Sequence, residues 1–126
     1  MKRVFLAVTI LLLIIILCVV SVSTVSLYRH DFTSRIQKLE ESIYSQNFEE
    51  LAQHAASVSR AWEHAEHVLI RFVRHIELDE ITAAMTRLEK LAKYGDLAEF
   101  SAELNRIKTL LNHIYDSEFP HLRNLL

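Results

Sequence analysis

Residues 4–22 of this chain read VFLAVTILLLIIILCVVSV. The stretch contains no charged side chain, and its polar interruptions are Thr9 and Ser21. A helix needs about 20 mostly apolar residues to cross the hydrocarbon core of a bilayer, so this stretch is long enough to span it once. Its Leu, Ile, Val and Phe side chains each favour insertion by about 0.3–0.6 kcal/mol. The sequence therefore predicts one N-terminal transmembrane helix, with residues 1–28 as the membrane anchor.

The remainder, residues 29–126, has the composition of a small all-α domain. The 126-residue chain contains one glycine and one proline, and this scarcity of turn residues favours long helices over a multi-stranded sheet. Beyond Lys2 and Arg3 there are 12 basic and 16 acidic residues, a net charge of −4. This balance argues against nucleic acid as a partner. The only cysteine, Cys18, lies in the apolar stretch, which excludes a disulfide within the chain.

The apolar stretch can be a retained anchor or a cleaved secretion signal. Lys2 and Arg3 form a basic segment before it, and Ser21-Val22-Ser23 is similar to a cleavage site. The apolar part of a signal peptide is about 7–15 residues long, so this longer stretch favours retention. The basic residues at the start favour an N-terminus in the cytoplasm. We therefore expect a single-pass protein of the cell membrane with an extracytoplasmic domain; secretion after cleavage is the alternative.

Helical spacing continues without a break after the apolar stretch. Apolar or aromatic residues recur every three or four positions and form one stripe: Val25, Tyr28, Phe32, Ile36, Leu39 and Ile43. This pattern predicts that one helix runs from the membrane into the domain. The segment 45–47 is the first predicted loop, and Asn47 is a suitable N-cap for the next helix.

A second apolar series alternates steps of three and four: Phe48, Leu51, Ala55, Val58, Trp62, Ala65, Leu69, Phe72 and Ile76. Such a series is typical of a helix that packs along its whole length against neighbours. The next core position, Ile81, comes five residues later. We therefore predict a corner or a kink at residues 77–79, which leaves open whether two helices or one kinked helix occupy this region.

Two more apolar series complete the domain. The first contains Ile81, Met85, Leu88 and Ala92, and the second contains Leu97, Phe100, Leu104, Ile107, Leu111 and Ile114. Between them, Gly95 suits a left-handed C-cap and Asp96 an N-cap. The last helix must end before Pro120. The sequence thus predicts two αα-hairpins that close into a small antiparallel bundle, with its first helix supplied by the anchor.

Histidines are the first candidates for chemistry, because the chain contains seven of them. His64 and His67 are three residues apart and share a helix face, as metal-ligating pairs do. Since Trp62 and Ala65 occupy the core stripe, however, this histidine face points to solvent. We interpret the pair as surface residues, with a metal site as the minor alternative, and we expect no cofactor. No catalytic constellation is recognisable, and an enzyme is not expected.

Two further groups are candidates for contacts with a partner. His75, Glu77 and Asp79 lie at the predicted corner, where a local capping cluster is the simpler interpretation. The C-terminal tail contains Leu122, Leu125 and Leu126. These residues either fold back over the end of the bundle, which avoids an exposed apolar patch, or form a short docking motif.

Several of these segments resemble one bacterial family, domain of unknown function 4363. The resemblance rests on Asn47-Phe48-Glu49-Glu50, on Trp62 with His64, on the stretch Phe72-x-x-His75-x-Glu77-Leu78-Asp79-x-Ile81, and on the ending Asn124-Leu125-Leu126. It implies a small, membrane-anchored helical protein and marks His75, Glu77 and Asp79 as more interesting than the outward histidines. It implies no particular activity.

Together these features predict a non-catalytic binding or scaffolding module for a membrane or envelope protein. Close attachment to the membrane would raise its effective concentration near such partners. A ligand or metal sensor that uses the histidines is one alternative, and a homo-oligomeric structural element is another.

Overall fold

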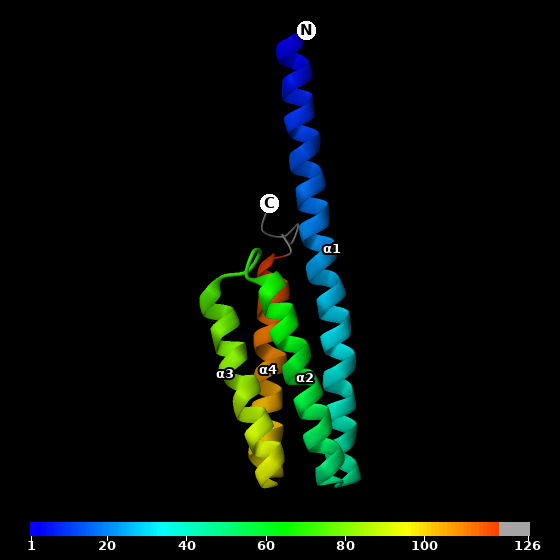
Figure 1. The fold of residues 1–126 in the computed structure, drawn as a ribbon, viewed down its shortest axis with the longest axis vertical. Coiled ribbons are helices and arrows are strands. Elements are labelled where there is room, and N and C mark those ends of the chain that lie inside the picture. Colours follow the sequence, from blue (N-terminus) through cyan, green and yellow to red (C-terminus); the bar gives the residue numbers. More distant parts are fainter. Residues whose placement is uncertain (119–126) are drawn as a thin grey trace.

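A computed structural model describes residues 1–118, and this part of the chain is entirely helical apart from short turns (Figure 1). The helices are α1 (Lys2–Ser45), α2 (Phe48–Leu69), α3 (His75–Tyr94) and α4 (Leu97–Glu118). No strand occurs among these residues. The predicted all-α fold is therefore confirmed.

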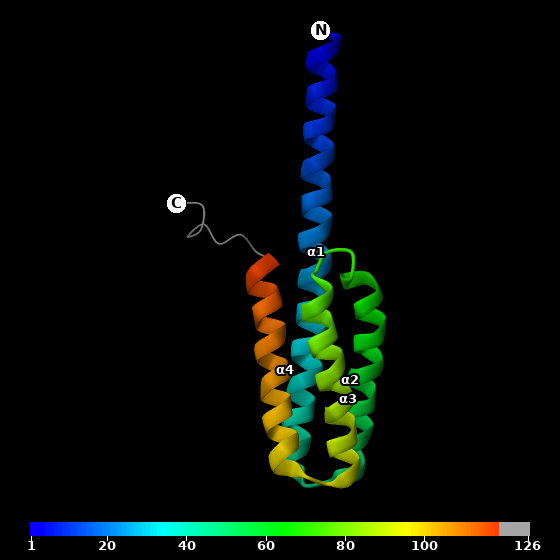
Figure 2. The same cartoon turned by 90° about the vertical axis from the view of Figure 1, so that its left-hand side faces the viewer.

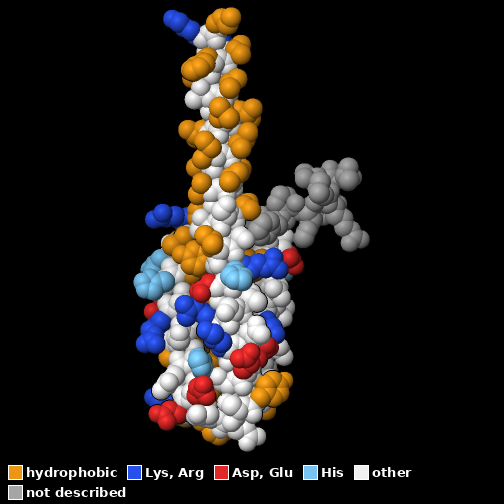
Figure 3. Space-filling view, turned by 90° about the vertical axis from the view of Figure 1, so that its right-hand side faces the viewer, with side chains coloured by type: hydrophobic (Ala, Val, Ile, Leu, Met, Phe, Trp, Pro, Cys, Tyr) orange, Lys and Arg blue, Asp and Glu red, His pale blue; other side chains and the backbone are white. Residues whose placement is uncertain are grey.

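Helix α1 has two parts with different surroundings. Its N-terminal part, residues 2–22, projects beyond the other helices and is called the stem below; the apolar side chains of the stem are exposed (Figures 1 and 3). This is the one helix of residues 1–118 that is long and apolar enough to cross a membrane, which is compatible with an anchor or a signal sequence. Farther along the same helix, Val25, Phe32 and Leu39 are at most 1% exposed. A single unbroken helix thus leads from the apolar stem into the packed domain.

The lower part of α1 and the three other helices form an antiparallel four-helix bundle (Figure 2). Helix α1 packs against α2 and α4, and α3 packs against the same two helices, so that the bundle is closed. Each helix buries most of the apolar residues in the stripe that its spacing predicts, with Ile81, Phe100 and Ile107 fully enclosed. The expected pair of αα-hairpins, α1–α2 and α3–α4, is confirmed.

Two of the three connections have the predicted turn residues. Gly95 has φ +74° and ends α3 in the left-handed conformation, which glycine adopts without steric cost. The side chains of Asn47 and Asp96 cap the following helices: Asn47 Oδ1 accepts from the Glu50 N–H (3.3 Å) and Asp96 Oδ1 from the Glu99 N–H (3.1 Å). These hydrogen bonds satisfy backbone donors that a helix start leaves unpaired.

The predicted corner at residues 77–79 is wrong, because the chain turns earlier, at residues 70–74. Helix α2 ends at Leu69, Arg74 adopts an extended conformation (ψ 137°), and α3 begins at His75 as a separate helix. Leu78 is therefore a core residue at 1% exposure, whereas Ile76, assigned to the core stripe, is 74% exposed. The apolar spacing continues through a turn that contains neither glycine nor proline, so the sequence pattern does not mark where the helix ends.

Trp62 of α2 is buried in the core, where it contacts residues of both α1 and α3. Its ring contacts Phe32 of α1 edge-on, with ring centroids 5.5 Å apart. Its indole N–H donates a hydrogen bond to Thr82 Oγ1 of α3 (2.8 Å), and the Thr82 hydroxyl lies 3.0 Å from Glu66 Oε1. Burial of the indole without an acceptor would be unfavourable, so Thr82 is the polar partner that allows a tryptophan at this position.

We expect Thr82→Val to destabilise the bundle by about 1–3 kcal/mol, because the buried Trp62 N–H would lose its acceptor. Thr82→Ser keeps a hydroxyl and should retain most of the stability. The free energy of unfolding can be measured in urea, followed by the fluorescence of Trp62, the only tryptophan in the chain. Equal stability of the valine and serine variants would contradict the proposed role of this hydrogen bond.

Candidate functional site

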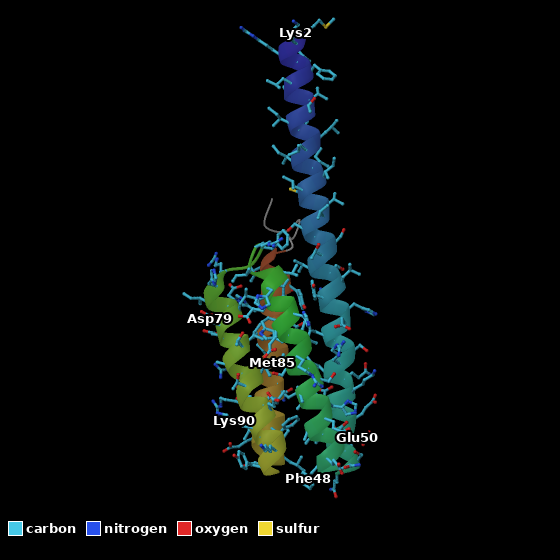
Figure 4. The ribbon with its side chains drawn as sticks, in the orientation of Figure 1. Lys2, Phe48, Glu50, Asp79, Met85 and Lys90 are labelled. Carbon is cyan, nitrogen blue, oxygen red and sulfur yellow. The ribbon has the colours of Figure 1, made fainter. Side chains whose placement is uncertain are left out.

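The two ends of the bundle differ in position relative to the stem. The turn between α2 and α3 lies at the end from which the stem projects, called the stem end here (Figures 1 and 2). The α1–α2 and α3–α4 turns lie at the opposite, distal end, where Phe48 and Glu50 are found (Figure 4). Exposed apolar and aromatic residues of the domain occur at both ends.

The stem end carries a surface of mixed apolar and basic character. Its residues, called the stem-end surface below, are Ile70, Arg71, Arg74, His75 and Ile76. Ile70 is 40% and Ile76 74% exposed, and the arginines and His75 are also exposed. The acidic residue next to it in the chain is Glu77, which is half-buried.

Backbone hydrogen bonds hold this turn in one conformation. The N–H groups of Phe72 and Val73 both donate to the Leu69 carbonyl, each at 2.8 Å. The Val73 side chain is 5% exposed and Phe72 packs against the core, so these two side chains hold the turn against the bundle. The backbone that carries the exposed residues of the stem-end surface is therefore held in place by hydrogen bonds and by packing against the core.

Contacts between α1 and α2 fix the height of this turn along the stem. Phe32 lies against Trp62, and Arg35 Nη1 donates to Ser57 Oγ (3.2 Å). Because the two helices are antiparallel, each step towards the end of α2 corresponds to a step back along α1. Leu69 is thus level with about Val25, and the turn that follows is level with about the last turn of the apolar stretch 4–22.

His75, Glu77 and Asp79 do not form one cluster, although all three lie in the first turns of α3. His75 and Asp79 are exposed, and Asp79 points away from the bundle (Figure 4). Glu77 is half-buried and lines a groove of about 260 Å³ beside His113 of α4. The tail residues Leu122, Leu125 and Leu126 lie outside the described residues.

His64 and His67 are exposed on α2, on the opposite side of the helix from the buried Trp62 and Ala65. Within residues 1–118, no group of three or more His, Cys, Asp or Glu side chains is arranged so that it could hold a metal ion. The structure thus places the pair on the surface that the core stripe predicts.

The distal end presents three aromatic side chains to solvent. Tyr44 is 87%, Phe48 48% and Tyr94 80% exposed. Phe48 was expected in the core stripe of α2, but it lies beyond the last packed layer, beside Gly95. No separate pattern in the sequence indicates this aromatic group, because its members come from three different helices.

A groove of about 330 Å³ runs between α1 and α4, and polar residues such as Gln37 and Asn112 line it. At its edge, Glu40 Oε1 accepts from Lys108 Nζ at 2.6 Å. Tyr115 also lines the groove and is 2% exposed; its hydroxyl has no hydrogen-bond partner among the described residues. Burial raises the pKa of the Tyr115 phenol, and the Arg29 guanidinium, 5.4 Å from the ring centroid, opposes this shift in part.

Comparison with known proteins identifies a family for the chain. The model of the family described as Domain of unknown function (DUF4363) matches residues 19–125. The match covers the last residues of the stem and the whole bundle, and the chain belongs to this family. No curated protein and no solved structure matches the chain.

The raised pKa of Tyr115 predicts a loss of stability in alkali. In the unfolded chain the phenol ionises near pH 10, whereas in the folded chain it stays neutral to higher pH. The stabilisation is thus complete below pH 10 and is lost as the pH rises, by at most about 1.4 kcal/mol per pH unit. Unfolding of the wild type and of Tyr115→Phe should be compared from pH 8 to 11. Parallel curves for the two proteins would contradict this expectation.

Proposed function

We propose that this member of the DUF4363 family is a single-pass membrane protein whose helical domain is a non-catalytic binding or scaffolding module for a membrane or envelope protein. In this proposal residues 4–22 cross the membrane, the N-terminus lies in the cytoplasm, and the bundle lies outside.

The continuity of α1 supports the membrane part of the proposal. The stem has apolar side chains exposed on all its faces, an arrangement that is unfavourable in water but suited to lipid. The same helix contributes Phe32 and Leu39 to the core. A transmembrane stem would therefore hold the bundle directly against the membrane, without a flexible linker.

The observation that carries the binding role is the aromatic distal end. Helix α2 has 22 residues, and at 1.5 Å per residue the distal end stands about 30 Å from the stem end. Tyr44, Phe48 and Tyr94 would thus project away from the membrane. Exposed tyrosine and phenylalanine side chains are typical of the residues that contribute most to protein–protein binding. A partner that extends from the membrane or envelope is the ligand that suits this geometry.

The membrane part can be tested by extraction and labelling. The full-length protein should stay in the membrane fraction after alkaline carbonate treatment. With Cys18→Ser as background, a cysteine introduced by Tyr94→Cys should react with a membrane-impermeant maleimide in intact cells, and one introduced by Lys2→Cys should not. A released protein that lacks residues 1–22 would contradict the proposal and favour secretion.

The binding role can be tested by photo-crosslinking in native cells. A photoreactive amino acid should replace Tyr44 or Tyr94, with Arg60, an exposed residue in the middle of α2, as the matched control position. We expect both distal probes to capture the same membrane or envelope protein and the control probe to capture none. Adducts only between copies of this chain would contradict the proposal and favour a homo-oligomeric structural element.

A further inference from the structure

We propose that the stem-end surface is a lipid-binding site that docks the bundle on anionic phospholipid headgroups. This inference rests on the proposed membrane insertion of the stem, and it assigns the stem end a ligand different from the protein partner of the distal end. The ligand is the phosphate-bearing surface of the bilayer from which the stem emerges.

The height of the turn brings it to the headgroup layer. The apolar stretch 4–22 has 19 residues, so that it spans about 29 Å, close to the thickness of the hydrocarbon core. The headgroup layer extends roughly 5–8 Å beyond the core on each side. The turn at residues 70–74 is level with about the last turn of this stretch, so it lies at the boundary between the hydrocarbon core and the headgroups when the stem crosses the membrane. From this level the long side chains of Arg71 and Arg74 can extend into the headgroup layer.

The charges of the stem-end surface are complementary to anionic lipid. Arg71 and Arg74 are exposed, and neither forms an ion pair with a described residue. Guanidinium groups form paired hydrogen bonds with phosphate oxygens. Glu77, in the first turn of α3, is half-buried in the groove beside His113, and Asp79 lies a turn farther from the stem.

The apolar members of the surface suit the boundary between headgroups and acyl chains. Ile76 is 74% exposed and Ile70 40% exposed, which is unfavourable in water at about 25 cal/mol per Å² of apolar surface. A basic surface with interspersed apolar side chains is typical of segments that lie in the membrane interface. The basic and the apolar residues both lie at the end of the bundle from which the stem projects, so one orientation of the protein would bring both to the membrane.

The test uses the full-length protein in vesicles of phosphatidylcholine, with or without phosphatidylglycerol. In the Cys18→Ser background, a fluorophore is attached after Ile76→Cys or, as the matched distal control, after Tyr94→Cys. Nitroxide groups on the lipid headgroups should quench the fluorophore at position 76 several-fold more than that at position 94. Quenching at 76 should increase with phosphatidylglycerol and decrease in 1 M salt, where the Debye length falls to about 3 Å.

Charge reversal gives the second arm of the test. Each arginine near an anionic surface favours contact by about fivefold, so loss of both would weaken the contact about twenty-five-fold and reversal of their charge would weaken it further. Arg71→Glu with Arg74→Glu should therefore abolish the phosphatidylglycerol-dependent quenching at position 76. Lys90→Glu with Lys93→Glu, near the distal end of the same helix, is the matched control and should have no effect.

The outcomes separate this inference from the proposed membrane anchor. Protein that does not co-float with the vesicles would refute the anchor itself. Protein that co-floats but shows equal quenching at positions 76 and 94 would overturn the lipid-binding site and leave the anchor intact. Quenching at 76 that is independent of phosphatidylglycerol and of the two arginines would also overturn the proposed recognition of anionic lipid.

Discussion

Packing of the lower half of α1 into the bundle is the constraint on which the rest of the structure depends. Val25, Phe32 and Leu39 are almost completely buried, and Phe32 lies against Trp62 at the centre of the core. Because these residues belong to the same helix as the stem, the direction of the stem is fixed by the core of the domain. An anchor joined through a flexible segment would leave the bundle free to rotate, whereas here the two ends of the bundle have defined positions relative to the stem.

This coupling gives the two ends of the bundle different proposed roles. The stem end, with exposed arginines and isoleucines, is placed to meet a lipid surface, and the distal end, with Tyr44, Phe48 and Tyr94, is placed to meet a protein. The helix length alone sets their separation at about 30 Å. With the proposed lipid-binding surface at the stem end and the aromatic residues at the distal end, the bundle would act as a rigid spacer that holds a protein partner at a fixed distance from the membrane. Contact between the stem end and the lipid headgroups would limit tilting of the stem, and this would keep the distal end at a constant distance from the membrane.

Much of the fold could be predicted from the sequence, and the misplaced corner shows where prediction ends. Gly95, Asn47 and Asp96 mark two of the three connections, since each supplies a backbone conformation or a cap that few residues provide. The α2–α3 turn has no such residue, and Phe72 and Ile76 continue the helical spacing through it. His75, Glu77 and Asp79 were therefore assigned to a corner, although they lie on a helix and face different surroundings. The spacing of the distal aromatic residues does not predict that they lie at one end, because they belong to three different helices.

The sequence by itself determined the helical class, the single apolar stretch, the core stripes and the outward direction of His64 and His67. These properties follow from composition and from a period of 3.6 residues, which are local. Only the tertiary structure decided where α2 ends, which apolar residues remain exposed, and that residues 70–76 return to the level of the stem. These features depend on how far antiparallel helices overlap, and that overlap is fixed by contacts between residues distant in the chain, such as Phe32 with Trp62 and Trp62 with Thr82. A sequence pattern describes each helix separately and does not contain their relative positions.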